Sequence, residues 1–233
     1  MKVRSVSFVF PMFNESENIA DTVRRASRLG SEICNDYEII IADDASADGS
    51  GDLADKIAAS DSHLKSVRLK ENSRFGGALN AGLKKASKDV IIYTDSDFPA
   101  REDDIKKALV LLDDADIITA YSLVIKDSSL KRIVMSKVYN FLVRALFGLK
   151  IRDINSGLKI YRKDALKGVE FISRSPFIDV EIFAEAVKRG FRIKQYGLIF
   201  ELRTKGESTI SRVSVVARTF YDMLKYRLFR YAA

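Results

Sequence analysis

The chain of 233 residues contains a single cysteine, a single histidine and no long hydrophobic run. With Cys34 alone, an intramolecular disulfide framework and a cysteine-based metal cluster are both excluded. The one histidine, His63, lies in the polar stretch SDSHLKS and is expected in a loop. Catalysis by a serine–histidine or cysteine–histidine pair is therefore not expected, and any acid–base chemistry must come from carboxylates.

Hydrophobic segments long enough for a membrane are also missing. No stretch reaches the roughly 18–20 apolar residues that a membrane-spanning helix needs. The first residues, MKVRSVSFVFPMF, form too short an apolar run for a secretory signal, and Pro11 interrupts it. The sequence predicts a protein that is not secreted and is either cytoplasmic or attached to the cytoplasmic face of a membrane.

The composition is that of a globular protein with an excess of positive charge. Hydrophobic residues make up 47% and charged residues 30% of the chain, and the net charge is +7. This excess favours a partner that carries phosphates, whether a nucleotide, a nucleic acid or an anionic membrane surface. The length suits one domain, which we expect to span residues 1–233.

Short apolar, β-branched runs alternate with helical patterns in the first half of the chain. This βαβα order predicts an α/β fold with a mostly parallel central sheet flanked by helices. Strands are expected at Ser5–Phe10, Glu38–Ala42, Ser66–Leu69, Val90–Thr94 and Asp116–Thr119. Helices are expected near Ser16–Leu29, Gly51–Ala59, Gly76–Ala86 and Glu102–Leu112.

The pattern changes from Ser128 onward, where two basic amphipathic helices are expected, at Ser128–Phe147 and at Arg212–Tyr231. Between them we expect a strand at Leu158–Tyr161, a helix near Val180–Arg189 and a strand within Arg192–Leu202. The last helix is either a core-packing element with a solvated outer face or an interfacial helix that lies on anionic lipid.

Two carboxylates, Asp95 and Asp97, directly follow the apolar run Val90–Tyr93. Crowded carboxylates at the end of a buried strand are costly unless a cation or hydrogen-bond donors compensate them. Mg²⁺ and Mn²⁺ prefer oxygen ligands and usually keep waters or substrate phosphates in their shell. The pair therefore predicts a divalent metal site, although it is also compatible with two solvated side chains where the strand reaches the surface.

A second acidic stretch, Asp43 to Ser50, follows the second expected strand. A carboxylate there is suited to ribose hydroxyls or a base N–H, whereas Ser46 and Asp48 are also able to cap the next helix. Together with NE after the first strand and DSD after the fourth, this stretch places three polar strand ends at one edge of the sheet. Ligands bind at that edge in open α/β sheets, so we expect a site there.

Four of these segments together resemble a known family. VSFVFPMFNESENI, YEIIIADDASADGS, NSRFGGALNAGL and VIIYTDSD come in the order and spacing of family 2 glycosyltransferases with a GT-A, Rossmann-like fold. The later SLKRIVMSKVYNFLVRALFG, IRDINSGLKIYRKDAL and LRTKGES resemble the polyprenyl-phosphate branch, typified by dolichyl-phosphate mannose and glucose synthases. The resemblance implies inverting, metal-dependent transfer of a hexose from a GDP- or UDP-linked donor to a polyprenyl phosphate at the cytoplasmic membrane face.

The resemblance also implies a division of the chain and a role for individual residues. Residues 1–125 would bind the nucleotide sugar, 126–211 the acceptor, and 212–233 would form the C-terminal amphipathic helix. The donor-binding set would be Pro11, Phe13, Glu15, Asp43, Asp44, Ser46, Asp95, Ser96 and Asp97. Of these, Asp95 and Asp97 would hold Mg²⁺ or Mn²⁺. Arg132 and Ser136, one helical turn apart, would contact the acceptor phosphate, and Arg203, in the substrate- and nucleotide-binding set, would help clamp phosphate oxygens.

Two departures from the sequence pattern of this branch leave the chemical class of the acceptor undecided. Ser122 and Thr209 stand where the branch commonly has an arginine and a lysine. A sugar-hydroxyl acceptor would need a general base, for which Asp179 in PFIDVEIF is the candidate. The alternative for Asp179 and nearby Glu181 is favourable negative charge at a helix N-terminus.

Three other interpretations compete with a polyprenyl-phosphate transferase. One is a soluble family 2 transferase that acts on a saccharide or protein hydroxyl. A sugar-1-phosphate nucleotidyltransferase is disfavoured because PMFNESEN contains no glycine. A basic nucleic-acid-binding protein is disfavoured because the basic residues are spread around acidic strand ends without a recognition motif, so no nucleic-acid partner is expected. The oligomeric state does not follow from the sequence.

Overall fold

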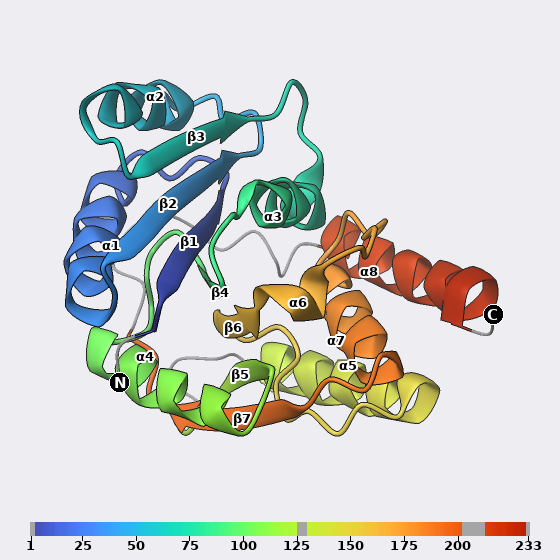
Figure 1. The fold of residues 1–233 in the computed structure, drawn as a ribbon. Coiled ribbons are helices and arrows are strands. Elements are labelled where there is room, and N and C mark those ends of the chain that lie inside the picture. Colours follow the sequence, from blue (N-terminus) through green and yellow to red (C-terminus); the bar gives the residue numbers. More distant parts are fainter. Residues whose placement is uncertain (1–2, 125–129, 202–212, 232–233) are drawn as a thin grey trace.

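A seven-stranded sheet forms the centre of the molecule (Figure 1). The computed structural model describes residues 3–124, 130–201 and 213–231. The strand order is β3-β2-β1-β4-β6-β5-β7, and every neighbouring pair is parallel except those that involve β6. The strands are β1 (Ser5–Met12), β2 (Asp36–Asp43), β3 (Leu64–Arg68), β4 (Val90–Thr94), β5 (Ile117–Ser122), β6 (Leu158–Arg162) and β7 (Ile193–Leu198).

The central strands are buried on both faces, which explains their continuous apolar runs. Every residue of β1 and β4 is buried. Successive side chains of β1 point to opposite faces, so Phe8 and Phe10 join one hydrophobic core while Val9 joins the other. The sheet therefore separates two cores.

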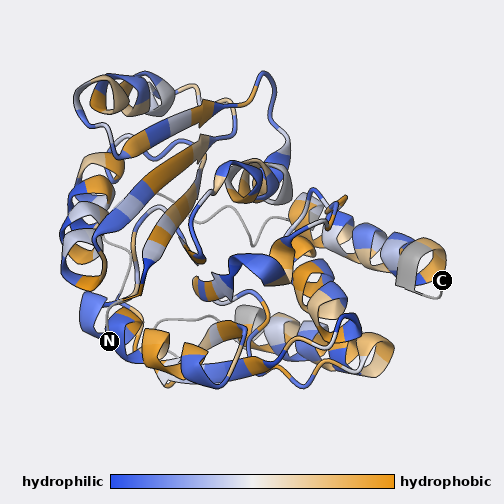
Figure 2. Cartoon of the chain, in the orientation of Figure 1, coloured by the Kyte–Doolittle hydropathy of each residue, from blue (hydrophilic) through white to orange (hydrophobic). Residues whose placement is uncertain are grey.

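Helices cover both faces of the sheet. The first core contains residues of α1 (Ile19–Ile33), α2 (Ser50–Ser60) and α4 (Glu102–Val110), whereas the second contains residues of α3 (Arg74–Lys85), α5 (Leu130–Phe147), α7 (Ile178–Lys188) and α8 (Val213–Tyr226). Figure 2 shows that α7 is largely hydrophobic, while hydrophilic and hydrophobic residues alternate around α1. Among the helices of the described residues, none combines the length and apolar character needed to cross a membrane.

The predicted α/β architecture is confirmed, with small differences in the helices. The first helix begins at Ile19, three residues later than expected, and the short helix α6 (Lys163–Leu166) was not expected. A 3-10 turn (Leu111–Asp113) follows α4, and a π-helical turn (Arg227–Tyr231) follows α8. Both extensions fall within the helical ranges that the sequence predicts, apart from one residue at Asp113.

Strand β6 has a particular consequence for the site. It runs antiparallel between β4 and β5, so its first residue, Leu158, pairs with Thr94 at the carboxyl end of β4. The Thr94 hydroxyl donates a hydrogen bond to the carbonyl of Gly157, at 2.7 Å. The loop before β6 is therefore held beside the strand end that carries Asp95.

A buried acid at the opposite end of the sheet contributes to stability. Glu38 of β2 is ion-paired with Lys65 and accepts hydrogen bonds from the Ser7 hydroxyl and the Ser87 amide, both at 2.6 Å. Burial alone would raise the pKa of Glu38, but these donors hold it at about 2, well below its ordinary value of 4.5. Because the folded-state pKa is depressed, the stabilisation is fully present above about pH 4.5 and is lost as the pH falls toward 2.

Glu38→Gln should lower the free energy of unfolding by about 2–3 kcal/mol at pH 7, because the neutral amide loses the ion pair and part of the hydrogen bonding. Urea unfolding across pH 2–7 measures this, and the variant should lose less stability than the parent over the acidic range. Asp36→Asn, which removes the exposed ion pair with Lys88, is the control and should cost less than about 1 kcal/mol. Equal losses for the two variants would contradict the prediction.

Candidate active site

The two aspartates expected to hold a metal lie on a tight turn that follows β4. The carbonyl of Asp95 accepts a hydrogen bond from the amide of Phe98, at 2.9 Å, which closes a four-residue turn containing Ser96 and Asp97. Asp95 and Asp97 are partly exposed, whereas Phe98 is buried. Phe98 has φ +49°, in the left-handed region that bulky residues rarely adopt. Its burial in the core holds the turn in this strained shape.

The surroundings of Asp95 orient its carboxylate. The buried Tyr93 hydroxyl donates a hydrogen bond to Asp95 Oδ1, at 2.9 Å. A Cβ atom added to Gly157 would lie 2.8 Å from Asp95 Oδ2, so this loop packs closely against the Asp95 carboxylate. Asp153 lies in the same loop; burial raises its pKa, and the negative charge of Asp95 adds to this effect. A third carboxyl group, which the sequence did not identify, therefore lies near the metal turn.

The side chains on this turn fit a hard divalent cation. Asp95 and Asp97 offer carboxylate oxygens, the ligands that Mg²⁺ and Mn²⁺ prefer. Over residues 3–124, 130–201 and 213–231, no group of three or more histidine, cysteine, aspartate and glutamate side chains forms a closed metal site. A cation held by Asp95 and Asp97 would therefore keep coordination positions for other oxygen ligands, such as phosphates or water.

Two loops at the same edge of the sheet, which follow β1 and β2, are locked together by hydrogen bonds. In each of these hydrogen bonds, a backbone amide of one loop donates to a side-chain oxygen of the other. The bonds are Asn14 amide to Ser46 Oγ (2.8 Å), Glu15 amide to Ser50 Oγ (2.8 Å), Ser16 amide to Asp48 Oδ2 (3.0 Å) and Ala47 amide to Asn14 Oδ1 (2.9 Å). Asn14 and Ala45 have positive φ, +55° and +58°, which adds strain at this edge.

The capping roles considered for Ser46 and Asp48 are only partly correct. Gly49, with φ +88°, occupies the N-cap position of α2, and Ser46 instead binds the loop after β1. Asp48 Oδ1 does accept a hydrogen bond from the Ser50 amide, at 3.0 Å, so Asp48 stabilises the first turn of α2. The polar composition of this stretch therefore serves the contact between two loops as much as the helix.

Asp43 and Asp44 are both buried at the end of β2. Asp44 Oδ1 accepts a hydrogen bond from the Ser73 amide, at 2.6 Å, just before α3. Burial raises the pKa of Asp44 to about 6, although the Ser73 amide acts in the opposite direction. Asp43 Oδ1 accepts a hydrogen bond from the Ser46 amide, at 3.2 Å, and Asp43 Oδ2 lies 3.8 Å from Arg68 Nε. Both carboxylates thus have protein partners, and their contact with a nucleoside stays a prediction.

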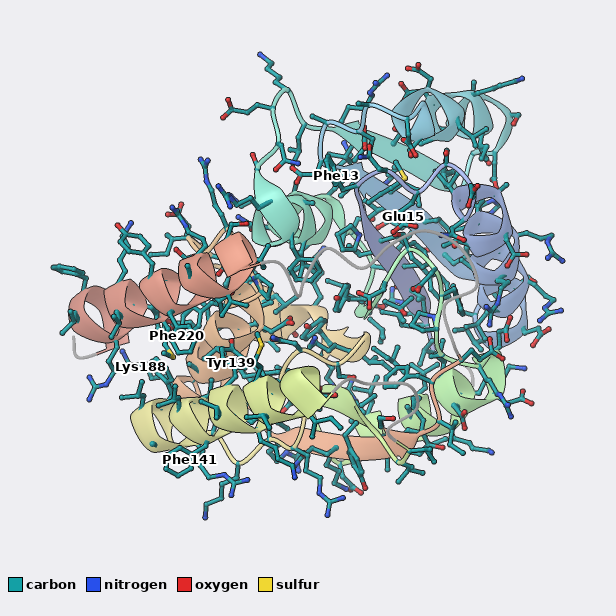
Figure 3. All side chains as sticks on the ribbon, turned by 180° about the vertical axis from the view of Figure 1, so that it is seen from behind. Phe13, Glu15, Tyr139, Phe141, Lys188 and Phe220 are labelled. Carbon is teal, nitrogen blue, oxygen red and sulfur yellow. The ribbon has the colours of Figure 1, made fainter. Side chains whose placement is uncertain are left out.

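The residues expected against a nucleotide base differ in exposure. Phe13, directly after β1, is 37% exposed, whereas Pro11 is buried within the strand. Glu15 Oε2 accepts a hydrogen bond from the Asn18 side chain, at 2.6 Å, which fixes the carboxylate beside the start of α1. Figure 3 shows Phe13 and Glu15 near the ends of β1 and β2. Of the three, Phe13 is the side chain available for stacking.

Asp179, the candidate base, lies in a fully buried ion pair. Its Oδ2 is 2.9 Å from the ammonium of Lys159, and the two side chains are 1% and 0% exposed. Lys159 also donates to the carbonyl of Ser156, at 2.7 Å, and lies 4.8 Å from the centroid of the Tyr93 ring. Burial raises the pKa of Asp179 to about 6, Lys159 opposes this, and the charge of Asp95 adds to it. Asp179 is therefore electrostatically linked to the metal turn.

Favourable negative charge at a helix N-terminus, the alternative role for Asp179 and Glu181, explains only part of what these residues do. Both residues lie in the first turn of α7, as that alternative requires. However, Asp179 is paired with a lysine, and Glu181 accepts hydrogen bonds from the amides of Ile172 and Ser173, each at 3.0 Å. Glu181 thus anchors the loop before α7. The role of Asp179 as a base stays a prediction.

The structure describes only part of the set of residues that were expected to contact phosphate groups of the substrates. Ser136 is exposed on α5, and its Oγ is 3.4 Å from the side-chain nitrogen of Asn140. The side chain of Arg132 and all of Arg203 lie outside the described residues. Ser122, which stands at the position of a branch arginine, donates to the carbonyl of Val124, at 2.6 Å.

Sequence reasoning missed Lys159 and two residues of α1, Thr22 and Arg25. Lys159 pairs with Tyr93 across the antiparallel β4–β6 ladder, a neighbour relation that local periodicity does not reveal. Thr22 did leave a signal, since it is a hydroxyl within the otherwise apolar face of α1. The Thr22 hydroxyl donates a hydrogen bond to the carbonyl of Ser96, on the turn that follows β4.

The sheet, the acidic turn after β4 and the interlocked loops beside it define an α/β enzyme of the GT-A type. The model of the glycosyl transferase family 2 matches residues 7–169, and the chain belongs to this family. The matched residues are those of a family 2 glycosyl transferase domain.

Two named relatives are similar to this chain over most of its length. Glycosyltransferase AglD of Haloferax volcanii is 27% identical over 94% of this chain and 37% of its own length. The undecaprenyl-phosphate 4-deoxy-4-formamido-L-arabinose transferase of Salmonella choleraesuis is 29% identical over 78% of this chain and 57% of its own length. The chain thus spans about a third to three fifths of these curated relatives.

A solved structure shares the fold. Glucosyl-3-phosphoglycerate synthase from Mycobacterium tuberculosis, in complex with Mn²⁺, uridine diphosphate and glucosyl-3-phosphoglycerate, superposes with a TM-score of 0.71. The match covers 96% of this chain and 80% of that chain, at 19% sequence identity. The similarity therefore concerns the fold.

Proposed function

We propose that this glycosyltransferase moves a hexose from a GDP- or UDP-linked nucleotide sugar to a polyprenyl phosphate, with inversion and with Mg²⁺ or Mn²⁺. The observation that carries the proposal is the Asp95–Asp97 turn at the end of β4, on the same sheet edge as Asp44. The Mn²⁺ and uridine diphosphate in the mycobacterial complex support a metal and a nucleotide donor. The name of the Salmonella relative supports a lipid-phosphate acceptor.

Residues 1–125 would form the donor half. Phe13 would stack on the base, and Asp44 would face the nucleoside from the end of β2. Asp95 and Asp97 would hold the cation, with the Asp95 carboxylate fixed by the hydrogen bond that it accepts from the Tyr93 hydroxyl. When bound, the cation supplies Lewis-acid neutralisation of the charge that develops on the leaving diphosphate. A single displacement from the opposite side of the sugar inverts its anomeric centre.

Residues 126–211 would form the acceptor half. A phosphate monoester is already anionic near neutral pH, since its second pKa is about 6, so it needs cations for positioning more than a base. Arg132 would supply such a charge and Ser136 a hydrogen bond, and Arg203 would help clamp phosphate oxygens. A pocket beside α8 offers further support for an anionic partner; it is lined by Ile172, Ser173, Arg174, Arg218, Asp222 and Lys225. Three cations and one acid give this pocket a net positive charge.

The C-terminal helix would lie on an anionic membrane at the cytoplasmic face. Large apolar side chains are exposed along α8 and the turn after it: Tyr221, Leu224, Leu228 and Phe229. Phe141 of α5 is 68% exposed, and Figure 3 shows it on the side of that helix away from Tyr139 and Phe220. Such side chains beside basic residues suit the boundary between headgroups and acyl chains.

A donor panel followed by product analysis tests the proposal. Thermal unfolding is measured with GDP- and UDP-linked sugars, with Mn²⁺ or Mg²⁺ and after chelation. We expect one donor to stabilise the protein only when metal is present, and a short polyprenyl phosphate, in detergent or anionic vesicles, to accept its sugar. Metal-independent binding, or transfer only to hydroxyl acceptors, would overturn the proposal. Salt-sensitive RNA binding without any nucleotide-sugar binding would favour the nucleic-acid hypothesis.

Asp179→Asn distinguishes the two acceptor classes. With a phosphate acceptor, we expect transfer within about tenfold of the parent, because no base is required and the amide still accepts a hydrogen bond from Lys159. Initial rates and nucleotide affinity are measured together. Glu185→Gln, which alters the contact of α7 with the Tyr226 hydroxyl, controls for general disturbance of the helix. Loss of transfer with intact nucleotide binding in Asp179→Asn alone would instead support a hydroxyl acceptor with Asp179 as base.

A further inference from the structure

The carbonyl of Ser96, between the two metal-turn aspartates, is held by a side chain of α1. Thr22 Oγ1 donates a hydrogen bond to Ser96 O, at 2.6 Å, and Thr22 is only 2% exposed. The neighbours of Thr22 on this face of α1, Ile19, Val23 and Ala26, are core residues. A hydroxyl in such surroundings needs a partner, and here that partner is the backbone of the metal turn.

Arg25, less than one helical turn further along α1, holds the rest of the same segment. Its Nη1 donates to the carbonyl of Phe98, at 2.9 Å, and its Nη2 to the carbonyl of Ala100, at 3.3 Å. The guanidinium also lies 4.4 Å from the centroid of the Phe98 ring. Alternate carbonyls, at residues 96, 98 and 100, thus accept donors from one face of α1.

The segment needs such support because its backbone is strained. Phe98 has φ +49°, a conformation that is unfavourable for a bulky residue and persists only where the surroundings impose it. The hydrogen bond within the turn joins Asp95 to Phe98, so any relaxation at Phe98 would displace the carboxylates. Arg25 of α1 donates to the carbonyl of Phe98, and Thr22 donates to the carbonyl of Ser96, which lies between the two aspartates.

Arg25 also forms ion pairs with two segments outside the turn. Its Nε is 2.9 Å from Glu102 Oε1, at the start of α4, and its Nη2 is 3.4 Å from Glu201. The Glu201 amide in turn donates to the carbonyl of Pro99, at 2.8 Å. Because α1 directly follows the loop of Phe13, one rigid helix connects that loop with the metal turn.

We propose that Thr22 and Arg25 are positioning residues that fix the spacing of the Asp95 and Asp97 carboxylates for a divalent cation. They act through the backbone of residues 96–100 and do not touch the cation themselves. The assignment rests on the proposed function, since it takes Asp95 and Asp97 as the metal-holding pair.

A pair of substitutions at Thr22 separates positioning from packing. Thr22→Val keeps the side-chain volume but removes the hydroxyl, whereas Thr22→Ser keeps the hydroxyl and removes a methyl group. Binding of Mn²⁺ is measured from the loss of the free-ion electron paramagnetic resonance signal, with UDP or GDP present. We expect Thr22→Val to weaken Mn²⁺ binding about tenfold and Thr22→Ser to stay within about twofold, since only the first substitution takes the donor away from the Ser96 carbonyl. A role in packing alone predicts the opposite order.

A second pair uses two arginines that share one acid. Arg25 and Arg28 both form ion pairs with Glu102, at 2.9 and 3.0 Å, but among their described contacts only Arg25 reaches the turn carbonyls. Arg25→Met should weaken Mn²⁺ binding at least about tenfold, and Arg28→Met should leave it within about twofold. Circular dichroism and thermal unfolding establish that each variant is folded.

The outcomes distinguish this inference from the function on which it rests. If the parent protein binds no Mn²⁺ with either nucleotide, the proposed function fails. If the parent binds Mn²⁺ and Thr22→Val binds it equally well, the positioning role is wrong while the proposed function stands. Equal weakening in Thr22→Val and Thr22→Ser would likewise overturn the positioning role.

Discussion

Asp97→Ala should reduce metal-dependent kcat/KM at least about a thousandfold while leaving the fold intact. A bound cation contributes several kcal/mol of charge stabilisation in the transition state, and about 4 kcal/mol corresponds to a thousandfold in rate. Asp97 provides one of the two carboxylates on the turn, so its loss should remove most of that contribution. Because Asp97 is partly exposed, we expect the free energy of unfolding to change by less than about 1 kcal/mol.

The measurement combines initial rates over a range of Mn²⁺ concentrations with urea unfolding. Asp103→Ala is the matched control, since Asp103 is an exposed acid in the first turn of nearby α4. That variant should keep kcat/KM within about twofold of the parent. Asp97→Ala activity within tenfold of the parent at saturating Mn²⁺ would remove the turn from the catalytic site.

Local patterns predict much of this fold because the central strands carry their own signal. Val90–Thr94 is buried on both faces, so burial alone accounts for its apolar run. The carboxylates that end this strand stand out against that run, and the structure places them on a turn. Because β2 and β4 both run parallel to β1, Asp44 lies at the same edge of the sheet as these carboxylates. The rule for βαβ connections is enough to predict this arrangement.

The remaining parts of the site depend on contacts between distant segments. Lys159 lies beside Tyr93 because β6 inserts antiparallel between β4 and β5, and no local period encodes that insertion. Phe98 carried no interpretable signal in the sequence. In the structure it is the buried anchor of the metal turn, held by Arg25 from a helix 73 residues earlier.

Helix starts show a similar limit. Ser16 is compatible with a helix, but its amide is used by Asp48 of the neighbouring loop, and α1 begins only at Ile19. The partner of that amide lies 32 positions away in the chain, so a local capping argument does not anticipate the contact.

Lys159→Met should be among the most destabilising single substitutions in the protein, at about 3–5 kcal/mol at pH 8, since it leaves a buried carboxylate without its cation. Lys159 and Asp179 are fully buried, and the ammonium also satisfies the carbonyl of Ser156. Chemical unfolding of the variant and the parent measures the loss. Lys163→Met, at an exposed lysine bonded to the carbonyl of Ser87, is the control and should cost less than about 1 kcal/mol.

The pH dependence of this loss identifies its cause. Burial already raises the pKa of Asp179 to about 6 in the parent, and removing Lys159 should raise it further. A folded-state pKa above the unfolded value means that the folded protein binds the proton more tightly, so stability falls as the pH rises through that range. The variant should therefore recover part of its stability when the pH is lowered from 8 to 5.

A second substitution at the partner completes the test. Adding Asp179→Asn to Lys159→Met removes the uncompensated charge, and the double variant should be more stable at pH 8 than Lys159→Met alone and should gain less stability than Lys159→Met when the pH is lowered to 5. If the double variant is no more stable than Lys159→Met, the loss comes from packing around β6 and not from the buried charge. Recovery would show that Lys159 is needed because Asp179 is ionised, which is the state that the hydroxyl-acceptor hypothesis requires of a general base.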